Sequence, residues 1–145
     1  NFDCDVVVNI QGDEPGINPL LIDQLIQLFE DPCVEMASIA STDLKENDLN
    51  NDNVVKVNLD EENNAISFIR NNLNPESTYY RHIGIYAYRK NTLNLFTSLS
   101  QSDNEKNHRL EQLRALDNNI AIKLLISDFN HRSIDVKEDL KNYEN

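Results

Sequence analysis

Two aspartates in this sequence follow segments that predict strands. Asp13 comes after an apolar run that ends at Ile10, and Asp135 comes directly after the short segment Ser133-Ile134. Ligands of open α/β sheets bind beyond the carboxyl ends of the strands. Mg²⁺ takes one or two protein carboxylates together with substrate phosphates. The two residues therefore predict a Mg²⁺ site. Each also has a simpler interpretation, Asp13 as a turn residue and Asp135 as a helix N-cap in a capping box with Glu138.

Glycine content and net charge exclude several classes of function. The 145 residues include three glycines, and none stands in a Walker-type or Rossmann glycine motif. There are 13 basic and 25 acidic residues, which gives a net charge of −12. No basic face can therefore be drawn for a nucleic acid or for an anionic membrane surface. No apolar run approaches the roughly 20 residues of a membrane-spanning helix.

The first third of the chain alternates between strand and helix patterns. Residues 5–10 form a β-branched apolar run, which is typical of a buried strand. Asn18 and Pro19 form an N-cap and first-turn pair, and they predict a helix that continues to about Glu30. Residues 36–40 predict a second buried strand. We expect this strand–helix–strand unit to be parallel and right-handed.

The rest of the chain adds a hairpin and further α/β segments. Residues 82–88 give the clearest strand pattern, because Ile83 and Ile85 alternate with His82, Gly84 and Tyr86. The other predicted elements are a hairpin of residues 54–59 and 65–69, helices at 91–99, 105–116 and 136–143, and strands at 120–126 and 133–134. This order predicts one α/β domain over residues 1–145, with a mixed, mostly parallel sheet and helices on both faces.

Six segments, in order along the chain, resemble 3-deoxy-manno-octulosonate cytidylyltransferases, the CMP-Kdo synthetases. Residues 6–15 resemble the family's V-V-N-V-Q-G-D-E-P segment, and residues 81–89, R-H-I-G-I-Y-A-Y-R, are nearly identical to the family string. The other four are Asn53 to Val57 (N-x-V-K-V), Phe68 to Arg70 (F-S-R), Leu110 to Arg114 (L-E-Q-L-R) and Ile134 to Leu140 (V-D-x-x-E-D-L). Six collinear matches make chance similarity improbable.

The resemblance implies a nucleotide-diphospho-sugar transferase-like fold and a defined reaction. Such enzymes transfer CMP from CTP to a 3-deoxy sugar acid (Kdo) for lipopolysaccharide synthesis, with Mg²⁺ and release of pyrophosphate. By this resemblance Asp13 and Asp135 are the catalytic metal ligands. The residues implied to line the sugar-acid pocket are Gln11, Arg70, His82, Tyr86, Glu111 and Gln112. Arg and His can neutralise a carboxylate, and Gln, Glu and Tyr can bond hydroxyls.

Each pocket residue also has a purely structural interpretation. His82 and Tyr86 share a strand face with Tyr88, and such stripes are commonly packing surfaces. Glu111 is placed to pair with Arg114 one helical turn later. Arg70, at the end of a strand, can simply be solvated.

The chain departs from the family pattern in two ways. Ile69 replaces the usual serine, His108-Arg109 replaces Glu-Ser, and Val136-Lys137 replaces Thr-Pro. These changes bear on the sugar pocket more than on the metal site. The family's glycine- and basic-rich loop, which holds the CTP phosphates, has no match here. We therefore expect these residues to be the C-terminal part of a longer enzyme, with the N-terminal nucleotide-binding portion absent.

The family also implies a cytoplasmic homodimer with residues 54–100, including the hairpin, as the dimerisation region. The expected partners are CTP and a 3-deoxy sugar acid. We expect no binding to a nucleic acid or to a membrane. Two other functions remain open. One is a related nucleotidyltransferase that activates another acidic sugar. The other is a truncated, non-catalytic folding or dimerisation module, and the coding sequence upstream of Asn1 distinguishes it from an enzyme.

Overall fold

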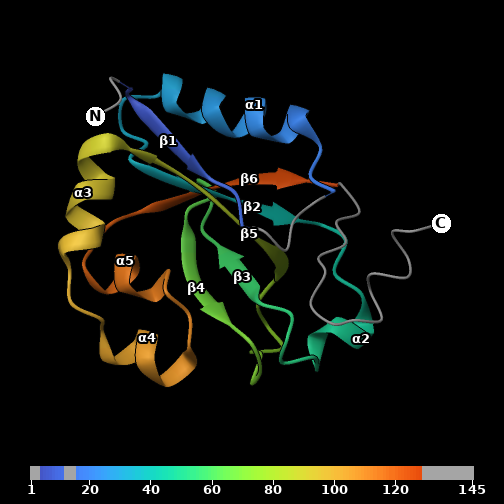
Figure 1. The fold of residues 1–145 in the computed structure, drawn as a ribbon. Helices are drawn as coiled ribbons and strands as arrows, with labels where there is room; N and C mark the ends of the chain where they lie inside the picture. The colour runs from blue at the N-terminus through green and yellow to red at the C-terminus, as the bar shows by residue number, and fades with distance from the viewer. Residues whose placement is uncertain (1–3, 12–15, 129–145) are drawn as a thin grey trace.

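A mixed sheet crosses the centre of the computed structural model, which describes residues 4–11 and 16–128 (Figure 1). Asp13, Asp135, the strand predicted at 133–134 and the helix predicted at 136–143 lie outside the described residues. The described strands are β1 (Val6–Asn9), β2 (Met36–Ser41), β3 (Lys56–Leu59), β4 (Ala65–Ile69), β5 (Tyr80–Arg89) and β6 (Ile122–Ser127). The described helices are α1 (Pro19–Gln27), η1 (Leu28–Glu30), α2 (Glu46–Leu49), α3 (Lys90–Ser98), α4 (Asp103–His108) and α5 (Leu113–Asp117).

The long strand β5 organises this sheet. The strand order is β4-β3-β5-β2-β6, and β1 also pairs with β5. Both β1 and β2 are antiparallel to β5, so they run parallel to each other with β5 between them. Among the described pairings, β2 with β6 is parallel and the other four are antiparallel.

The prediction of a mixed sheet is confirmed, but the prediction of mostly parallel pairing is wrong for the described strands. The β1–α1–β2 unit has the expected direction, since both strands are antiparallel to β5. The sequence pattern of that unit gave no sign that a later strand would insert into it. Because β5 lies between β1 and β2 and runs opposite to both, neither of these parallel strands has the other as its neighbour.

Helices cover both faces of the sheet, as predicted (Figure 1). On one face, Leu21 and Leu25 of α1 pack with Ile83 and Ile85 of β5. On the other face, a larger cluster joins β5 to α3, α5 and the β3–β4 hairpin. Its members include Tyr86, Tyr88, Phe68, Phe96 and Leu113. The alternation predicted for residues 82–88 therefore does separate two cores.

The N-terminus of α1 is confirmed, whereas the helix predicted at 105–116 is not continuous. The Asn18 side chain accepts a hydrogen bond from the Leu20 N–H and caps α1. Arg109 adopts left-handed backbone angles (φ 55°, ψ 47°) and ends α4. The chain then turns through Leu110, which is buried, before α5 begins. The spacing of Leu110 and Leu113 suggested one continuous helix. Both residues do pack in the core, although they stand on either side of a turn and not on one helix.

Among the helices of the described ranges, none has the length and apolar character needed to cross a membrane.

Candidate functional site

Three of the predicted pocket residues meet around Gly84 on β5. His82, Gly84 and Tyr86 alternate along one face of the strand, and the Gln11 side chain lies over Gly84. A Cβ atom at position 84 would stand 3.1 Å from Gln11 Oε1. The absence of a side chain at Gly84 therefore allows the Gln11 amide to lie against the strand. This close approach joins the segment after β1 to the middle of β5.

A row of aromatic rings runs along the same face. His82 lies between Phe68 and Tyr86, with ring centroids 4.9 Å and 5.5 Å away. Tyr86 stacks on Tyr88 at 6.1 Å, and Tyr88 stacks on Phe96 at 5.9 Å. These contacts fix the ring positions, since aromatic pairs of this kind favour particular geometries. Tyr86 and Tyr88 belong to the core, so this stripe is a packing surface in the structure.

His82 is a neutral, hydrogen-bonded side chain in this structure. Its Nε2 atom lies 2.9 Å from the hydroxyl of Ser38 on β2. Burial lowers the pKa of His82 to about 3, because desolvation disfavours the charged imidazolium. The role of His82 in the sugar-acid pocket stays a prediction, and in this structure its ring carries no charge with which to neutralise a carboxylate. A neutral imidazole supplies one donor and one acceptor and no net charge.

Tyr86 combines a buried ring with a hydroxyl to which no described group hydrogen-bonds. Its side chain is 8% exposed. Burial, followed by Tyr88 and the Glu111 carboxylate, raises the pKa of Tyr86 well above its usual range. The phenol therefore stays protonated at neutral pH, and it can donate a hydrogen bond or accept one.

Glu111 and Gln112 lie in the turn between α4 and α5. The Glu111 carboxylate accepts a hydrogen bond from Arg114 Nη2 at 3.2 Å, so the predicted Glu111–Arg114 pair is present. The Glu111 side chain is nonetheless 66% exposed, and one of its oxygens has no described partner. Gln112 is buried at the start of α5. Leu110 and Leu113, on either side of these two residues, pack in the same core cluster as Tyr86.

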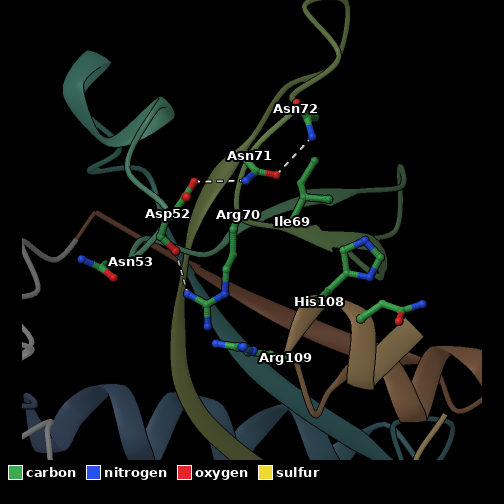
Figure 2. Close-up of a pocket in the computed structure, with 9 residues that line it drawn as sticks. Asp52, Asn53, Ile69, Arg70, Asn71, Asn72, His108 and Arg109 are labelled. Atoms are coloured by element: carbon green, nitrogen blue, oxygen red, sulfur yellow. Dashed lines mark hydrogen bonds between the residues drawn. The ribbon is translucent and has the colours of Figure 1, made fainter. Parts of the chain in front are cut away.

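Arg70 lies apart from these residues, in a neighbouring open cavity of about 600 Å³. Three segments form its wall: residues 52–53, the end of β4 with residues 70–72, and residues 107–109 at the C-terminal end of α4 (Figure 2). Arg70 Nη1 donates a hydrogen bond to the Asp52 carbonyl at 2.8 Å. None of Gln11, His82, Tyr86, Glu111 or Gln112 lines this cavity. The structure thus brings Gln11, His82 and Tyr86 together on β5, whereas Arg70 lines a separate cavity.

Two residues that the sequence did not single out as functional are associated with Arg70, one in the cavity and one beneath the Arg70 backbone. Arg109 lines the cavity together with Arg70, and no described group forms a hydrogen bond or ion pair with the Arg109 side chain. Lys56 is fully buried, and its Nζ donates to the carbonyls of Asn51 at 2.8 Å and Arg70 at 2.5 Å. Burial lowers the pKa of Lys56. The replacement of Glu-Ser by His108-Arg109 was the one available signal for Arg109.

The metal site predicted at Asp13 and Asp135 stays a prediction, because both residues lie outside the described ranges. Across residues 4–11 and 16–128, no group of three or more His, Cys, Asp or Glu residues could hold a metal ion.

Comparison with known proteins identifies the class and then the family. The α/β sheet with helices on both faces matches the fold of a sugar-activating nucleotidyltransferase whose solved structure is described below. A family model described as "Cytidylyltransferase" matches residues 1–124. The chain therefore belongs to the cytidylyltransferase family.

Two curated relatives share substantial identity with the chain. A 3-deoxy-manno-octulosonate cytidylyltransferase of Chloroherpeton thalassium is 41% identical over an alignment of 150 positions, gaps included, that covers 97% of this chain and 61% of the relative. An 8-amino-3,8-dideoxy-manno-octulosonate cytidylyltransferase of Shewanella frigidimarina is 36% identical over an alignment of 149 positions, gaps included, that covers 98% of this chain and 61% of the relative. The chain thus spans about 61% of the length of these relatives.

A solved structure of CMP:2-keto-3-deoxy-manno-octonic acid synthetase complexed with CTP has the same fold. It superposes with a TM-score of 0.90 at 28% sequence identity, covering 98% of this chain and 61% of that one. The predicted resemblance to CMP-Kdo synthetases and the predicted fold class are confirmed.

Proposed function

We propose that the protein transfers CMP from CTP to Kdo with release of pyrophosphate, and that these residues form its sugar-acid side. The observation that carries the proposal is the meeting of Gln11, His82 and Tyr86 around Gly84. These residues come from separate segments that resemble the Kdo enzymes, and the close approach at Gly84 brings the segments together. The relatives named as Kdo cytidylyltransferases support the same activity.

The cavity beside β5 suits the acidic end of such a substrate. Arg70 and Arg109 line it together, along with Asn53, Asn71 and Asn72. Guanidinium groups bind carboxylates in a fork geometry, and amide side chains bond hydroxyls. We assign the sugar carboxylate to the two arginines. The sugar hydroxyls fall to Gln11, His82, Tyr86, Glu111 and Gln112.

Mg²⁺ is part of the proposal, with Asp13 and Asp135 as its ligands. The predicted positions of the two aspartates after strand segments and the family resemblance support this assignment. A bound Mg²⁺ would neutralise charge on the transferring phosphoryl group, which is the main requirement of such reactions. The residues of this chain supply orientation, since Lys56 fixes the Arg70 backbone and Phe68 packs against His82.

The direct test is pyrophosphate release from CTP, Mg²⁺ and Kdo. It is run on the 145-residue chain and on the product of the complete reading frame that contains it. We expect release from the complete product. A complete product that carries the basic glycine loop and releases no pyrophosphate with any sugar acid contradicts the proposal. A reading frame without that loop supports the alternative of a non-catalytic module.

The sugar acid itself is settled by the same assay with two substrates. The second is 8-amino-3,8-dideoxy-manno-octulosonate, the sugar named for the Shewanella relative. We expect a higher kcat/KM for Kdo. A higher kcat/KM for the amino sugar favours the alternative of an enzyme for another acidic sugar.

A homodimer and a cytoplasmic location in lipopolysaccharide synthesis complete the proposal. The exposed Ile66 on β4 supports a dimer at the hairpin, because its side chain is 57% exposed on the last strand in the sheet order. Ile66→Lys should lower the mass measured by analytical ultracentrifugation from dimer to monomer without unfolding the chain. If the dimer mass is unchanged in Ile66→Lys, the dimer interface does not include this part of the hairpin. CTP is a cytoplasmic nucleotide, which supports the location.

A further inference from the structure

The strands β2 and β5 change register at Ser38. Ser38 pairs with Tyr86, whereas the next residue, Ile39, pairs with Ile83. Residues 84–85 are therefore extra on β5 and form a bulge opposite Ser38. Bulges interrupt the regular ladder and redirect neighbouring side chains. Here the bulge lies in the centre of the candidate site, directly beneath the aromatic row.

The Ser38 hydroxyl occupies this bulge and has three polar neighbours. The side chain is fully buried, and Oγ lies 2.8 Å from the Ile85 carbonyl and 3.2 Å from the Ile83 carbonyl. The third neighbour is His82 Nε2, at 2.9 Å. Carbonyl oxygens only accept, and a hydroxyl carries one hydrogen. Ser38 therefore donates to Ile85 and can only accept from His82.

These bonds assign the hydrogen on the imidazole ring. If Ser38 accepts, Nε2 carries the ring hydrogen, and the other nitrogen of a neutral ring, Nδ1, has a free lone pair. Burial keeps the ring neutral by lowering the pKa of His82 to about 3. No described group donates a hydrogen bond to Nδ1. The rings of Phe68 and Tyr86 on either side limit reorientation of the imidazole.

We propose that Ser38 is a positioning residue that holds His82 in the Nε2–H form, so that Nδ1 accepts a hydrogen bond from a hydroxyl group of the ligand. The ligand class is thereby a polyhydroxylated molecule that presents a donor to β5. A carboxylate has only acceptors and would be repelled by the Nδ1 lone pair. The identity of that ligand as a sugar acid rests on the proposed function, whereas the form of the ring does not.

The first test reads the ring directly, without substrate. Long-range ¹H–¹⁵N NMR spectra of the 145-residue chain distinguish protonated from bare ring nitrogens. The chain has three histidines, and the His82 signals are identified by their loss in His82→Gln. We expect a protonated Nε2 and a bare Nδ1 from pH 5 to pH 8. A protonated Nδ1, or a doubly protonated ring at pH 6, overturns the proposal.

The second test removes the hydroxyl in the complete reading-frame product. Ser38→Ala should raise the KM for Kdo about fivefold to tenfold, the equivalent of one hydrogen bond, with a smaller change in kcat. Ser38→Thr keeps a hydroxyl and should retain a KM near the original value. Ser67→Ala is the matched control, because the Ser67 hydroxyl bonds Asn58 and not His82. An unchanged KM in Ser38→Ala overturns the positioning role.

The third test identifies the ligand group. Kdo analogues that each lack one hydroxyl are compared with Kdo as competitors of the native enzyme and of His82→Phe. One analogue should bind the native enzyme at least fivefold more weakly than Kdo does. The same analogue and Kdo should bind His82→Phe with equal affinity. If every analogue keeps the same ratio in both enzymes, His82 accepts no substrate hydroxyl. A wild-type enzyme inactive on all sugar acids contradicts the proposed function instead, and leaves the NMR result standing.

Discussion

Glu105 and Arg114 form a two-point ion pair that joins α4 to α5. Arg114 Nε lies 2.7 Å from Glu105 Oε2, and Arg114 Nη2 lies 2.6 Å from Oε1. The side chains are 6% and 11% exposed, respectively. The guanidinium also lies over the Phe96 ring, 4.8 Å from its centroid. The pair thus fixes the turn that carries Glu111 and Gln112 against the core.

Removing one partner of this pair should destabilise the protein. Glu105→Gln leaves the largely buried Arg114 guanidinium with only the exposed carboxylate of Glu111, and we expect a loss of about 3 kcal/mol in the free energy of unfolding. Urea denaturation measures it. Lys106→Gln is the matched control on α4, because its ion pair with Asp103 is exposed and should contribute less than about 1 kcal/mol. Equal effects of the two substitutions would contradict a buried pair.

The same pair predicts a dependence of stability on pH. The hydrogen bonds from Arg114 lower the pKa of Glu105. The pair therefore contributes its full stability above the pKa of an unfolded glutamate, about 4.3. That stability falls as the pH drops through the lower pKa of the folded state. Urea midpoints measured from pH 7 to pH 3 should decline more steeply in the native chain than in Glu105→Gln. Parallel declines would argue against this contribution.

Arg109 should matter for substrate binding and not for folding. Its left-handed backbone suits asparagine, so Arg109→Asn should not lower the free energy of unfolding. Losing a charge-assisted hydrogen bond to the sugar carboxylate should raise the KM for Kdo about tenfold or more. Steady-state kinetics measure this change. Lys106→Gln is the control, because it removes a positive charge from α4 outside the cavity. A similar rise in KM in this control would show that the effect of Arg109 comes from overall charge and not from a direct contact.

Adding a methyl group at Gly84 should impair substrate binding but leave folding almost unchanged. In Gly84→Ala the new Cβ would stand 3.1 Å from Gln11 Oε1, so the Gln11 amide must move by a few tenths of an ångström. The end of a flexible side chain can move at little cost to stability. We expect a severalfold higher KM for Kdo and a thermal midpoint close to that of the native chain. In a Gln11→Ala background, Gly84→Ala should cause little further rise in the KM for Kdo. If the effects of the two substitutions on KM are additive, the two residues act independently.

The two aspartates should be required for Mg²⁺-dependent turnover. Asp13→Ala and Asp135→Ala should each abolish pyrophosphate release in the complete product while the circular dichroism spectrum is retained. Asp135→Ala should also cost about 1 kcal/mol of stability through loss of the predicted helix cap. Turnover that survives either substitution refutes the ligand role of that residue.

Local sequence signals predicted most individual elements correctly. Asn18-Pro19 identified the start of α1, and the alternation of Ile83 and Ile85 with His82 and Tyr86 identified the two faces of β5. The break at Arg109 was missed, because arginine gives no local signal for a left-handed residue and the leucines on both sides keep helical spacing. The insertion of β5 beside β1 was missed because pairing between distant strands leaves no periodicity in either one.

The candidate site was predicted from resemblance more than from chemistry. Neither the lowered pKa of His82 nor the contact of Ser38 with it can be read from the sequence, because both arise when β2 and β5 pair with a bulge. Lys56 was part of a resembling string, but its bonds to the Asn51 and Arg70 carbonyls depend on tertiary packing. The sequence indicated which residues could bind a substrate. The pairing of distant strands determined whether their side chains are charged and which way they point.

The pairing of β1 with the far end of β5 has a consequence for synthesis of the chain. Val6 pairs with Arg89 and Asn9 pairs with Tyr86, so the first strand finds its described partner only after that distant segment exists. Pairings over such sequence separations form slowly because loop closure costs entropy first. On the ribosome, residues 6–9 cannot pair with β5 until Arg89 has emerged. Until then the apolar run Val6–Val8 lacks this partner, and Gln11 can reach Gly84 only after both segments have been synthesised.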